Sequence, residues 1–493
     1  MKQPSFDSAS WQQPAAAYSH CPFWFWNDRL DEGEIVRQIA DFQVHGVDAF
    51  VIHPRIGLPH DQGWMSPRLL DCMRTALAEA KRRGMWVMLY DEGMYPSGSG
   101  SGTVVARNPE FRARGLVCRP RGEAGAGRPI AALPGRPIDV WDTPVDAVVR
   151  GLHYIGDEAA ASPGEEEPPA ADLLNPEAME CFIEVVYDRF HAELGEYFGN
   201  TIKAIFTDEP HPLGRCRTPS AVPGSAAFLD WFRQRFGYDF TPHLESLWFD
   251  GPDAETHRRT YKEAVAARLD ETYYRPLARW CESKGIALTG HPAEPDELGH
   301  LKHFHIPGQD IVWRHVEPGK PSALGGPPST MAKAAASSAF HWGRERNLNE
   351  FAGAFGDDLT FRELCWLASW LLIRGCDLLA PHAFYYSFRG PRCTERPPDV
   401  GPNSPWWGEY RSWEAMTRRL CWLNATFKPV CSVAILGDNT RLPWRAAKAC
   451  FESQVDFHYV CPADLVTASV ENGALCVGPG RYRTVIVEAG YRA

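Results

Sequence analysis

The chain has 493 residues, of which 44% are hydrophobic and 23% are charged, a composition typical of a soluble globular protein. At this length we expect about three domains, or one large barrel with additions. The formal net charge of −11 argues against nucleic-acid binding, which needs a cationic surface. The sequence contains no apolar run of the ~18 residues that span a bilayer, so we expect no membrane partner.

The cellular location is predicted from the N-terminus and the cysteines. The opening segment, MKQPSFDSASWQQP, lacks the apolar stretch of a secretory signal. The 14 cysteines are scattered and form no CxxC pair, so we interpret them as buried free thiols rather than disulfides or metal ligands. Both features predict a cytoplasmic protein.

Short apolar segments alternate with amphipathic helices along most of the chain. Each apolar segment ends in polar residues, as buried parallel strands do where their carboxyl ends face a site. The predicted strands are residues 22–27, 49–53, 86–92, 202–209, 286–291, 310–315, 347–351 and 377–386. The predicted helices are residues 32–45, 67–84, 176–198, 224–284, 329–344, 359–374 and 405–424.

This alternation predicts a (β/α)8 barrel over residues 1–429. A doubly wound open sheet is the alternative. It would need a glycine-rich turn after its first strand, where this chain has Trp26, Asn27 and Asp28.

Two segments depart from the alternation. Residues 104–170 are rich in Pro, Gly, Ala and Glu, and predict an insertion after the third strand, with β-like pieces such as 146–155 and a mobile loop at its end. Residues 430–493 predict the start of a small α/β domain, truncated after its third strand. Its expected elements are strands at 430–436, 455–460 and 482–487 and a helix at 444–453.

The polar residues at the strand ends are the candidate functional residues, because the chemistry of a (β/α)8 barrel lies at that rim. Carboxylates, histidines and aromatic residues predominate there, without an HExxH, GxSxG or P-loop motif. Two carboxylates without a nucleophilic Ser or Cys point to glycoside hydrolysis. In that reaction one carboxyl protonates the leaving oxygen and the other acts as nucleophile or as base for water.

Glu209 and Glu350 are the candidate catalytic pair. Glu209 follows the fourth strand in the sequence TDEP, and the charge of the neighbouring Asp208 would raise its pKa, as a proton donor requires. Glu350 lies in an apolar strand end, where an unpaired carboxylate is costly and therefore needs a reason. The alternatives are a loop carboxylate for Glu209 and an ion pair with Arg344 or Arg346 for Glu350.

Other rim residues are predicted to bind sugar hydroxyls or to stack on sugar rings. They are Trp26, Asn27, His53, Arg55, Asp91, Glu92, Asp208, His291, Glu294, His382 and Tyr385, with Asp310, His315 and Tyr386 on the same rim. Adjacent strand residues point to opposite faces, so Asp91 and Glu92 cannot both face the barrel axis, and one of them could be structural. Glu294 is an alternative for either catalytic role, while His53 and His382 could be core histidines.

Six segments of the chain, taken together and in order, resemble motifs of a known family. They are PFWFWND (22–28), VIHPRIGLP (51–59), LYDEGMYPSGSGSG (89–102), IFTDEP (205–210), NEFAGAFGDDLTF (349–361) and LLAPHAFYYSFRGPR (378–392). Over about residues 20–440 the chain thereby resembles the bacterial α-L-rhamnosidases of glycoside hydrolase family 106 and their relatives.

The resemblance implies a (β/α)8 catalytic barrel with paired glutamates, in which Glu209 is the general acid and Glu350 is the partner carboxylate. It also implies that residues from 430 onward begin a flavodoxin-like domain, which in relatives continues further. The substrate-pocket residues that it implies are His53, Asp91, Glu92, His382 and Arg389.

The leading hypothesis is a cytoplasmic glycoside hydrolase, α-L-rhamnosidase-like, that acts on an oligosaccharide or a small glycoside. The alternatives are a non-catalytic carbohydrate-binding barrel and a metal-assisted lyase or isomerase. The carboxylates and histidines of the rim could hold a structural or substrate-site Ca²⁺, and no other cofactor is expected. No nucleic-acid or membrane partner is expected, and the chain could form oligomers.

Overall fold

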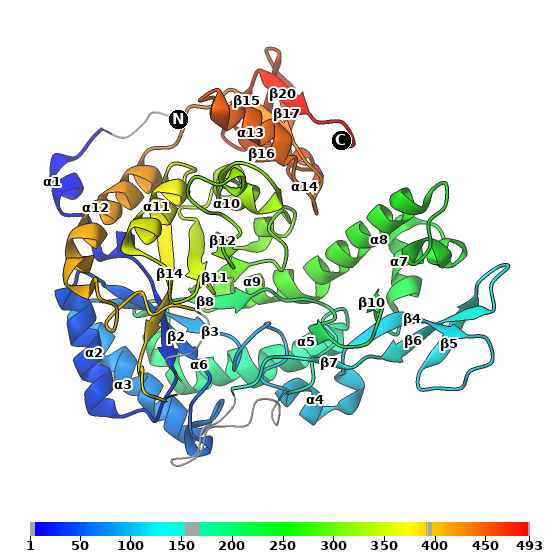
Figure 1. Ribbon diagram of the computed structural model, residues 1–493, viewed down its shortest axis with the longest axis horizontal. Helices are drawn as coiled ribbons and strands as arrows, with labels where there is room; N and C mark the ends of the chain where they lie inside the picture. The colour runs from blue at the N-terminus through cyan, green and yellow to red at the C-terminus, as the bar shows by residue number, and fades with distance from the viewer. Residues whose placement is uncertain (1–4, 153–166, 391, 393–396, 492–493) are drawn as a thin grey trace.

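Eight parallel strands close into a barrel in the computed structural model, which describes residues 5–152, 167–390, 392 and 397–491 (Figure 1). Around the barrel, each strand pairs with the next one along the chain and the last pairs with the first. The strands are β1 (Phe23–Trp26), β2 (Ala49–Pro54), β3 (Trp86–Tyr90), β8 (Ile202–Asp208), β11 (Ala287–His291), β12 (Ile306–Val312), β13 (Leu348–Gly353) and β14 (Leu378–Tyr385). The predicted (β/α)8 fold is confirmed.

The first strand shows how an almost uniformly aromatic segment builds this barrel. Alternate side chains of β1 point to opposite faces, so Phe23 and Phe25 pack inside the barrel while Trp24 and Trp26 pack outside it. Trp24 contacts Phe42 of helix α2 (Glu32–Val44) at a ring-centroid distance of 5.2 Å. Burial on both faces therefore explains why the segment lacks an apolar–polar alternation.

Helices surround the barrel, and their ends follow local sequence signals. In α3 (Pro67–Arg83), Ser66 accepts a hydrogen bond from the amide of Leu69, and Gly84 ends the helix in the left-handed conformation that glycine favours. The other helices packed around the barrel are α5 (Pro176–Phe182), α6 (Arg189–Leu194), α9 (Arg275–Ser283), α10 (Met331–His341), α11 (Phe361–Leu372) and α12 (Trp407–Thr426).

Three sequence predictions differ from the structure. The sixth strand begins at Ile306 rather than at residue 310 and ends before Trp313 and Arg314, whose φ values of 57° and 54° end the extended backbone. The predicted helix 176–198 contains a π-helical segment at Ile183–Asp188. The predicted helix 224–284 divides into α7 (Phe228–Phe236), α8 (Ala254–Leu269) and α9. Gly237 ends α7, a 3-10 helix at Thr241–Leu247 precedes α8, and a π-helical segment at Asp270–Tyr274 joins α8 to α9.

The segment after β3 forms a lobe beside the barrel. A four-stranded antiparallel sheet contains β4 (Arg114–Pro120), β5 (Arg128–Ala132), β6 (Ile138–Pro144) and β10 (Val222–Gly224). Because β10 comes from the chain after β8, two insertions combine into one lobe, which also carries α7 and α8 (Figure 1). Two short strands, β7 (Ala147–Val148) and β9 (Arg215–Cys216), pair between the same insertions. The predicted loop at the end of 104–170 falls largely on 153–166, outside the described residues.

The C-terminal segment forms a separate small unit, drawn in orange and red in Figure 1. Three strands, β15 (Val433–Leu436), β16 (His458–Val460) and β20 (Thr484–Val487), form a parallel sheet in the order β16-β15-β20, with helix α13 (Trp444–Glu452) between the first two. The sequence prediction missed one feature, an antiparallel sheet of three short strands that precede β20. They are β17 (Ser469–Glu471), β18 (Ala474–Val477) and β19 (Gly480–Tyr482).

None of the described helices has both the length and the apolar character that crossing a membrane requires.

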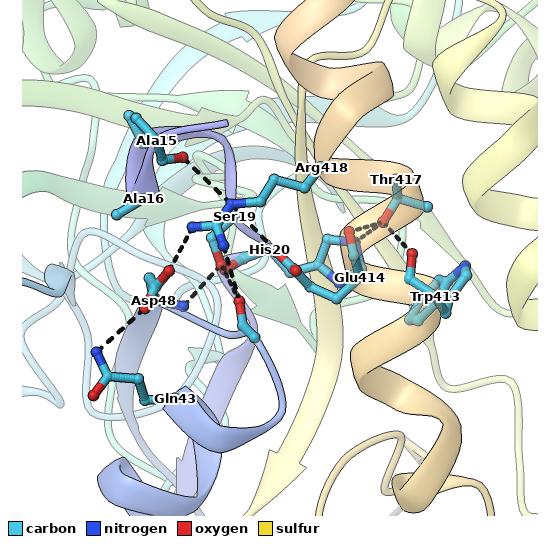
Figure 2. Close-up of polar contacts among 12 residues, drawn as sticks. Ala15, Ala16, Ser19, His20, Gln43, Asp48, Trp413, Glu414, Thr417 and Arg418 are labelled. Atoms are coloured by element: carbon cyan, nitrogen blue, oxygen red, sulfur yellow. Dashed lines mark hydrogen bonds and ion pairs between the residues drawn. The ribbon is translucent and has the colours of Figure 1, made fainter. Parts of the chain in front are cut away.

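A buried charge network ties helix α12 to the chain around β1 and β2 (Figure 2). The guanidinium of Arg418 pairs with Asp48 and lies 3.8 Å from a carboxylate oxygen of Glu414. It also donates to the carbonyl oxygens of Ala15 at 3.3 Å and of Gly46 at 3.4 Å. Burial raises the pKa of Glu414 to about 7, although Arg418 opposes this shift. Arg418 thus satisfies partners from three separate segments of the chain.

We predict that Arg418→Met lowers the free energy of unfolding by about 2–4 kcal/mol, since it leaves two carboxylates and two carbonyls without their cation. Thermal melting of the variant beside wild type measures the loss. Arg411→Met on the exposed face of the same helix is the matched control and should melt within about 1 °C of wild type. Equal melting of Arg418→Met and Arg411→Met would contradict the structural role of the network.

Candidate active site

One rim of the barrel gathers acidic and imidazole side chains from five consecutive strands. Asp208 ends β8 and pairs in register with His291 of β11, while Asp310 of β12 pairs with Glu350 of β13. His382 comes from β14, the next strand around the barrel. Because parallel strands present their carboxyl ends at the same edge, residues far apart in the sequence meet in one small volume.

Glu350 lies at the centre of this group, between two imidazoles. Its Oε1 atom is 2.7 Å from Nδ1 of His382, and its Oε2 atom is 3.3 Å from Nε2 of His291. Burial alone would raise the pKa of this carboxyl, but the charge of His382 and the hydrogen bond from His291 lower it to about 2. Glu350 is therefore an ionised carboxylate in a buried position.

His291 bridges Glu350 and Asp208. Its Nε2 atom is 3.4 Å from Oδ1 of Asp208, while Nδ1 lies 3.3 Å from the carbonyl oxygen of Pro292 and can donate to it. Burial opposes a charge on this imidazole, but the hydrogen bond to Glu350 and the charges of Glu350 and Asp208 outweigh it. They raise the pKa of His291 well above 6.5, so the imidazole is held as a cation.

The pKa of Glu209 is shifted in the opposite direction to that of Glu350. It follows β8 directly and has a left-handed backbone, with φ of 44°. Burial and the negative charge of Asp208 raise its pKa to about 8, and the charge of Glu350 adds to the shift. Near neutral pH, Glu209 is therefore a protonated carboxylic acid beside the ionised Glu350.

The loop after β3 fixes the backbone that carries Asp208 and Glu209. Ser97 donates its amide to the carbonyl of Asp208 and accepts the amide of Asp208 on its hydroxyl, both at 2.8 Å. The Ser97 hydroxyl in turn donates to Asp91 at 2.5 Å, and the Tyr187 hydroxyl donates to the other oxygen of Asp91 at 2.8 Å. Tyr90 of β3 donates its hydroxyl to Asp208. Asp91 thus acts on the site through Ser97.

The backbone amides of the same loop surround the carboxylate of Glu92. It accepts backbone amides from Gly93 and Ser99 at 2.9 Å, from Gly100 at 2.8 Å, and from Ser101. Burial raises the pKa of Glu92 to about 7, whereas these amides favour its charged form. All four donors belong to the turn that brings Ser97 to Asp208.

A small pocket with a volume of about 80 Å³ opens at this rim. Its lining residues are Arg55, Tyr95, Arg150, Asp208, Glu209, Asp310, Val312, Trp313, Glu350, Ala354, His382 and Pro397. Five of the predicted site residues, Arg55, Asp208, Glu209, Glu350 and His382, line the pocket.

Two predicted histidines lie just behind the pocket wall. His291 contacts two pocket carboxylates, as described above. His53 is buried and stacks on Tyr90 at a centroid distance of 3.8 Å, and its ring lies parallel to His382 at 6.3 Å. Within the described part of the chain, neither ring nitrogen of His53 has a hydrogen-bond partner.

The remaining predicted substrate-binding residues do not line the pocket. The carboxylate oxygens of Asp91 and Glu92 already accept hydrogen bonds from within the protein. The interpretation that one of these residues binds sugar hydroxyls therefore does not fit this geometry. Trp26 packs outside the barrel, and Tyr385 packs inside it against Phe25.

Three more predicted residues are also placed away from this pocket. Asn27 exchanges two hydrogen bonds of 2.9 Å with the backbone of Ser387, which joins the ends of β1 and β14. Arg389 pairs with Asp28 at 2.7 Å and is 79% exposed, while Glu294 lines a neighbouring cavity. Asn27 and Arg389 thus have structural or peripheral positions in the described geometry.

Seven lining residues were not in the predicted set of site residues, and four of these, Asp310, Tyr95, Arg150 and Trp313, are polar or aromatic. Asp310 was predicted to lie on the rim, but the sixth strand was predicted to begin at this residue, whereas β12 begins four residues earlier. The sequence therefore did not predict that Asp310 lies beside Glu350. Tyr95 and Arg150 come from the loop after β3 and from the insertion, where no periodic pattern predicts a position. Trp313, 51% exposed, follows β12 at the mouth of the pocket.

Asp208, His291 and Glu350 could together hold a divalent cation, because one ligand atom from each lies within 4.8 Å of the others. A mixed oxygen and nitrogen set suits a transition metal better than Ca²⁺, which takes six to eight oxygen ligands. The raised pKa of His291 also means that a metal would have to displace the proton on Nε2. The residues present thus fit a hydrogen-bonded imidazolium better than a Ca²⁺ site.

The chain is similar in fold to several solved glycosidase structures. The rhamnosidase from Novosphingobium sp. PP1Y matches 98% of this chain and 67% of its own, with a TM-score of 0.71 and 14% identity. A GH42 β-galactosidase from G. stearothermophilus matches 91% of this chain and 66% of its own, with a TM-score of 0.53 and 10% identity. This chain thus spans about two thirds of the length of each of these proteins. At such low identities the comparison shows a shared fold.

No protein-family model matches the chain, and no curated protein sequence matches it.

We predict that Glu92→Gln lowers the unfolding free energy by about 2–4 kcal/mol, because an amide cannot accept all four buried backbone donors. Thermal melting measures the change. Glu110→Gln, at an exposed position of the same insertion, is the control and should leave the melting temperature unchanged. A Glu92→Gln protein that melts like wild type would contradict the scaffold role assigned to this carboxylate.

Proposed function

We propose that the protein is a glycoside hydrolase, with Glu209 as general acid and Glu350 as nucleophile or as base for water. The observation that carries this proposal is the presence of two carboxyls with opposite protonation in one pocket, since glycosidases divide the two roles in this way. The glycosidase structures of similar fold support it.

The proposed mechanism follows from the two environments. Glu209 gives its proton to the glycosidic oxygen as the bond to the sugar breaks. Glu350 faces the positive charge that develops on the sugar ring, and stays ionised because His291 and His382 stabilise it. The anomer formed first, observed by NMR, distinguishes a nucleophile (retention) from a base (inversion).

We further propose that the substrate is an oligosaccharide or small glycoside and that an α-L-rhamnoside is the first sugar to test. The six motifs that resemble glycoside hydrolase family 106 favour this sugar. Trp313, which is half exposed, and the guanidinium groups of Arg55 and Arg150 line the pocket, and such side chains are common in sugar-binding sites. The 13 described cysteines are free thiols, which supports the proposal of a reducing, cytoplasmic location.

A metal-assisted lyase or isomerase is a second candidate, favoured by the cluster of Asp208, His291 and Glu350. Elemental analysis of the purified protein distinguishes the two candidates. A stoichiometric transition metal, with activity that depends on it, would support the second candidate over the first.

We predict that wild type hydrolyses one member of a panel of p-nitrophenyl glycosides, and that Glu209→Gln and Glu350→Gln lower kcat by at least about 100-fold. The loss in Glu209→Gln should be smaller with p-nitrophenol than with a sugar as leaving group, because p-nitrophenolate needs less protonation. Glu409→Gln, exposed on α12, is the control. Full activity in both site variants would exclude the two-glutamate mechanism.

We predict that kcat/KM falls as the pH rises through about 8, because Glu209 must be protonated to act as acid. Glu350 has a pKa of about 2, so it stays ionised and active across the acidic range in which the protein is folded. In Glu209→Gln the basic limb should disappear from the residual activity. A basic limb that is unchanged in this variant would assign the acid to another group.

A further inference from the structure

A second cavity is lined in part by the chain that follows Glu209, from Pro210 to Pro212. Its volume is about 260 Å³, and Pro210, the residue directly after Glu209, lines it. Glu294 of the loop after β11 lines it, and the charge of Glu294 helps to raise the pKa of Glu209, which shows how close the cavity comes to that carboxyl. Glu209 and Glu350 line the first pocket, and the residue next to Glu209 in the chain lines this cavity.

The wall of the second cavity is mainly apolar. Helix α8 and strand β10 of the lobe contribute one side, and the chain after β8 and the loop after β11 contribute the other. Among the apolar lining residues are Pro212, Val222, Leu247, Val265, Ala266 and Leu269. Such a wall suits an apolar ring system better than a second sugar, whose hydroxyls need many donors and acceptors.

The two cations that line the cavity are already engaged within the chain. Arg258 donates to the carbonyl of Ser246 at 2.7 Å and to Asp250 at 2.8 Å. Lys262 donates to the carbonyl of Thr440 at 3.1 Å and lies 3.9 Å from Glu297. Their charges are therefore offset by the protein, and an anionic ligand has no dedicated partner among them.

We propose that this cavity is the leaving-group subsite of the enzyme and that it binds an apolar aromatic or polycyclic aglycone. The inference rests on the proposed glycosidase function, in which the bond between sugar and leaving group lies beside the general acid. The sugar then occupies the carboxylate pocket, Glu209 reaches the glycosidic oxygen, and the aglycone extends between α8 and the loop after β11. The lobe built from the two insertions thereby selects the leaving group.

Two substrates with the same sugar and different leaving groups test the proposal. A 2-naphthyl glycoside carries an aromatic aglycone, and the glycosyl fluoride carries none. Val265→Asn puts a polar group of similar volume on the wall without changing the charge near Glu209, and Leu247→Asn puts one on the segment just before α8. Both should lower kcat/KM for the naphthyl glycoside roughly five- to thirtyfold and leave the fluoride unchanged.

Ala267→Asn is the matched control, because it lies on the same helix but lines a different cavity. It should alter neither substrate. A loss of kcat/KM in Val265→Asn and Leu247→Asn that is confined to the naphthyl glycoside supports the subsite. An equal loss with both substrates, or no loss in either variant, overturns it. Activity on the fluoride shows in the same experiment that each variant is folded.

Binding of free 2-naphthol, measured by NMR, separates failure of this inference from failure of the proposed function. Wild type should bind 2-naphthol, and Val265→Asn should bind it more weakly. If no glycoside is hydrolysed but this binding difference is found, the cavity is an aromatic-ligand site and the glycosidase proposal falls. If glycosides are hydrolysed and 2-naphthol binds both proteins equally, the subsite proposal falls alone.

Discussion

The contact on which the site depends is the pairing of Glu350 with two imidazoles. A buried carboxylate is costly without partners, and His291 and His382 supply them from the strands β11 and β14. The same pairing fixes the charge of the neighbours, because the ionised Glu350 and Asp208 keep His291 cationic and help to keep Glu209 protonated. One arrangement of five strand ends therefore produces an acid and an anion side by side.

The position of the acid depends on a second layer of contacts behind the barrel rim. Asp91 orders Ser97, Ser97 holds the backbone of Asp208, and Glu209 follows in a left-handed conformation. Left-handed backbone is strained for a glutamate and persists only where the surroundings impose it. The loop around Glu92 supplies that constraint, which is why the β3 loop bears on the chemistry although neither of its carboxylates lines the pocket.

The barrel could be predicted from the sequence because its signals are local. Apolar segments ending in Asp208, His291 and Glu350 mark strands whose polar ends share one rim, and this places the central site residues. Asp310 was placed on the rim but not among the site residues, because Pro307 and Gly308 in its strand obscure where the strand begins. Arg150 and Tyr95 reach the pocket through contacts between parts of the chain that are far apart in the sequence, and no local sequence pattern predicts such contacts. The scaffold roles of Asp91 and Glu92 likewise depend on how a glycine-rich loop folds back.

The most direct test of the central claim is a titration of the two carboxyls by NMR, with ¹³C-labelled glutamate and with Glu209→Gln and Glu350→Gln to assign the signals. We expect one carboxyl, Glu209, to remain protonated up to a pH near 8, and the other, Glu350, to remain ionised down to the lowest pH at which the protein is folded. Two carboxyls that both titrate near 4.5 would contradict the account, since neither would then be prepared as acid or as anion.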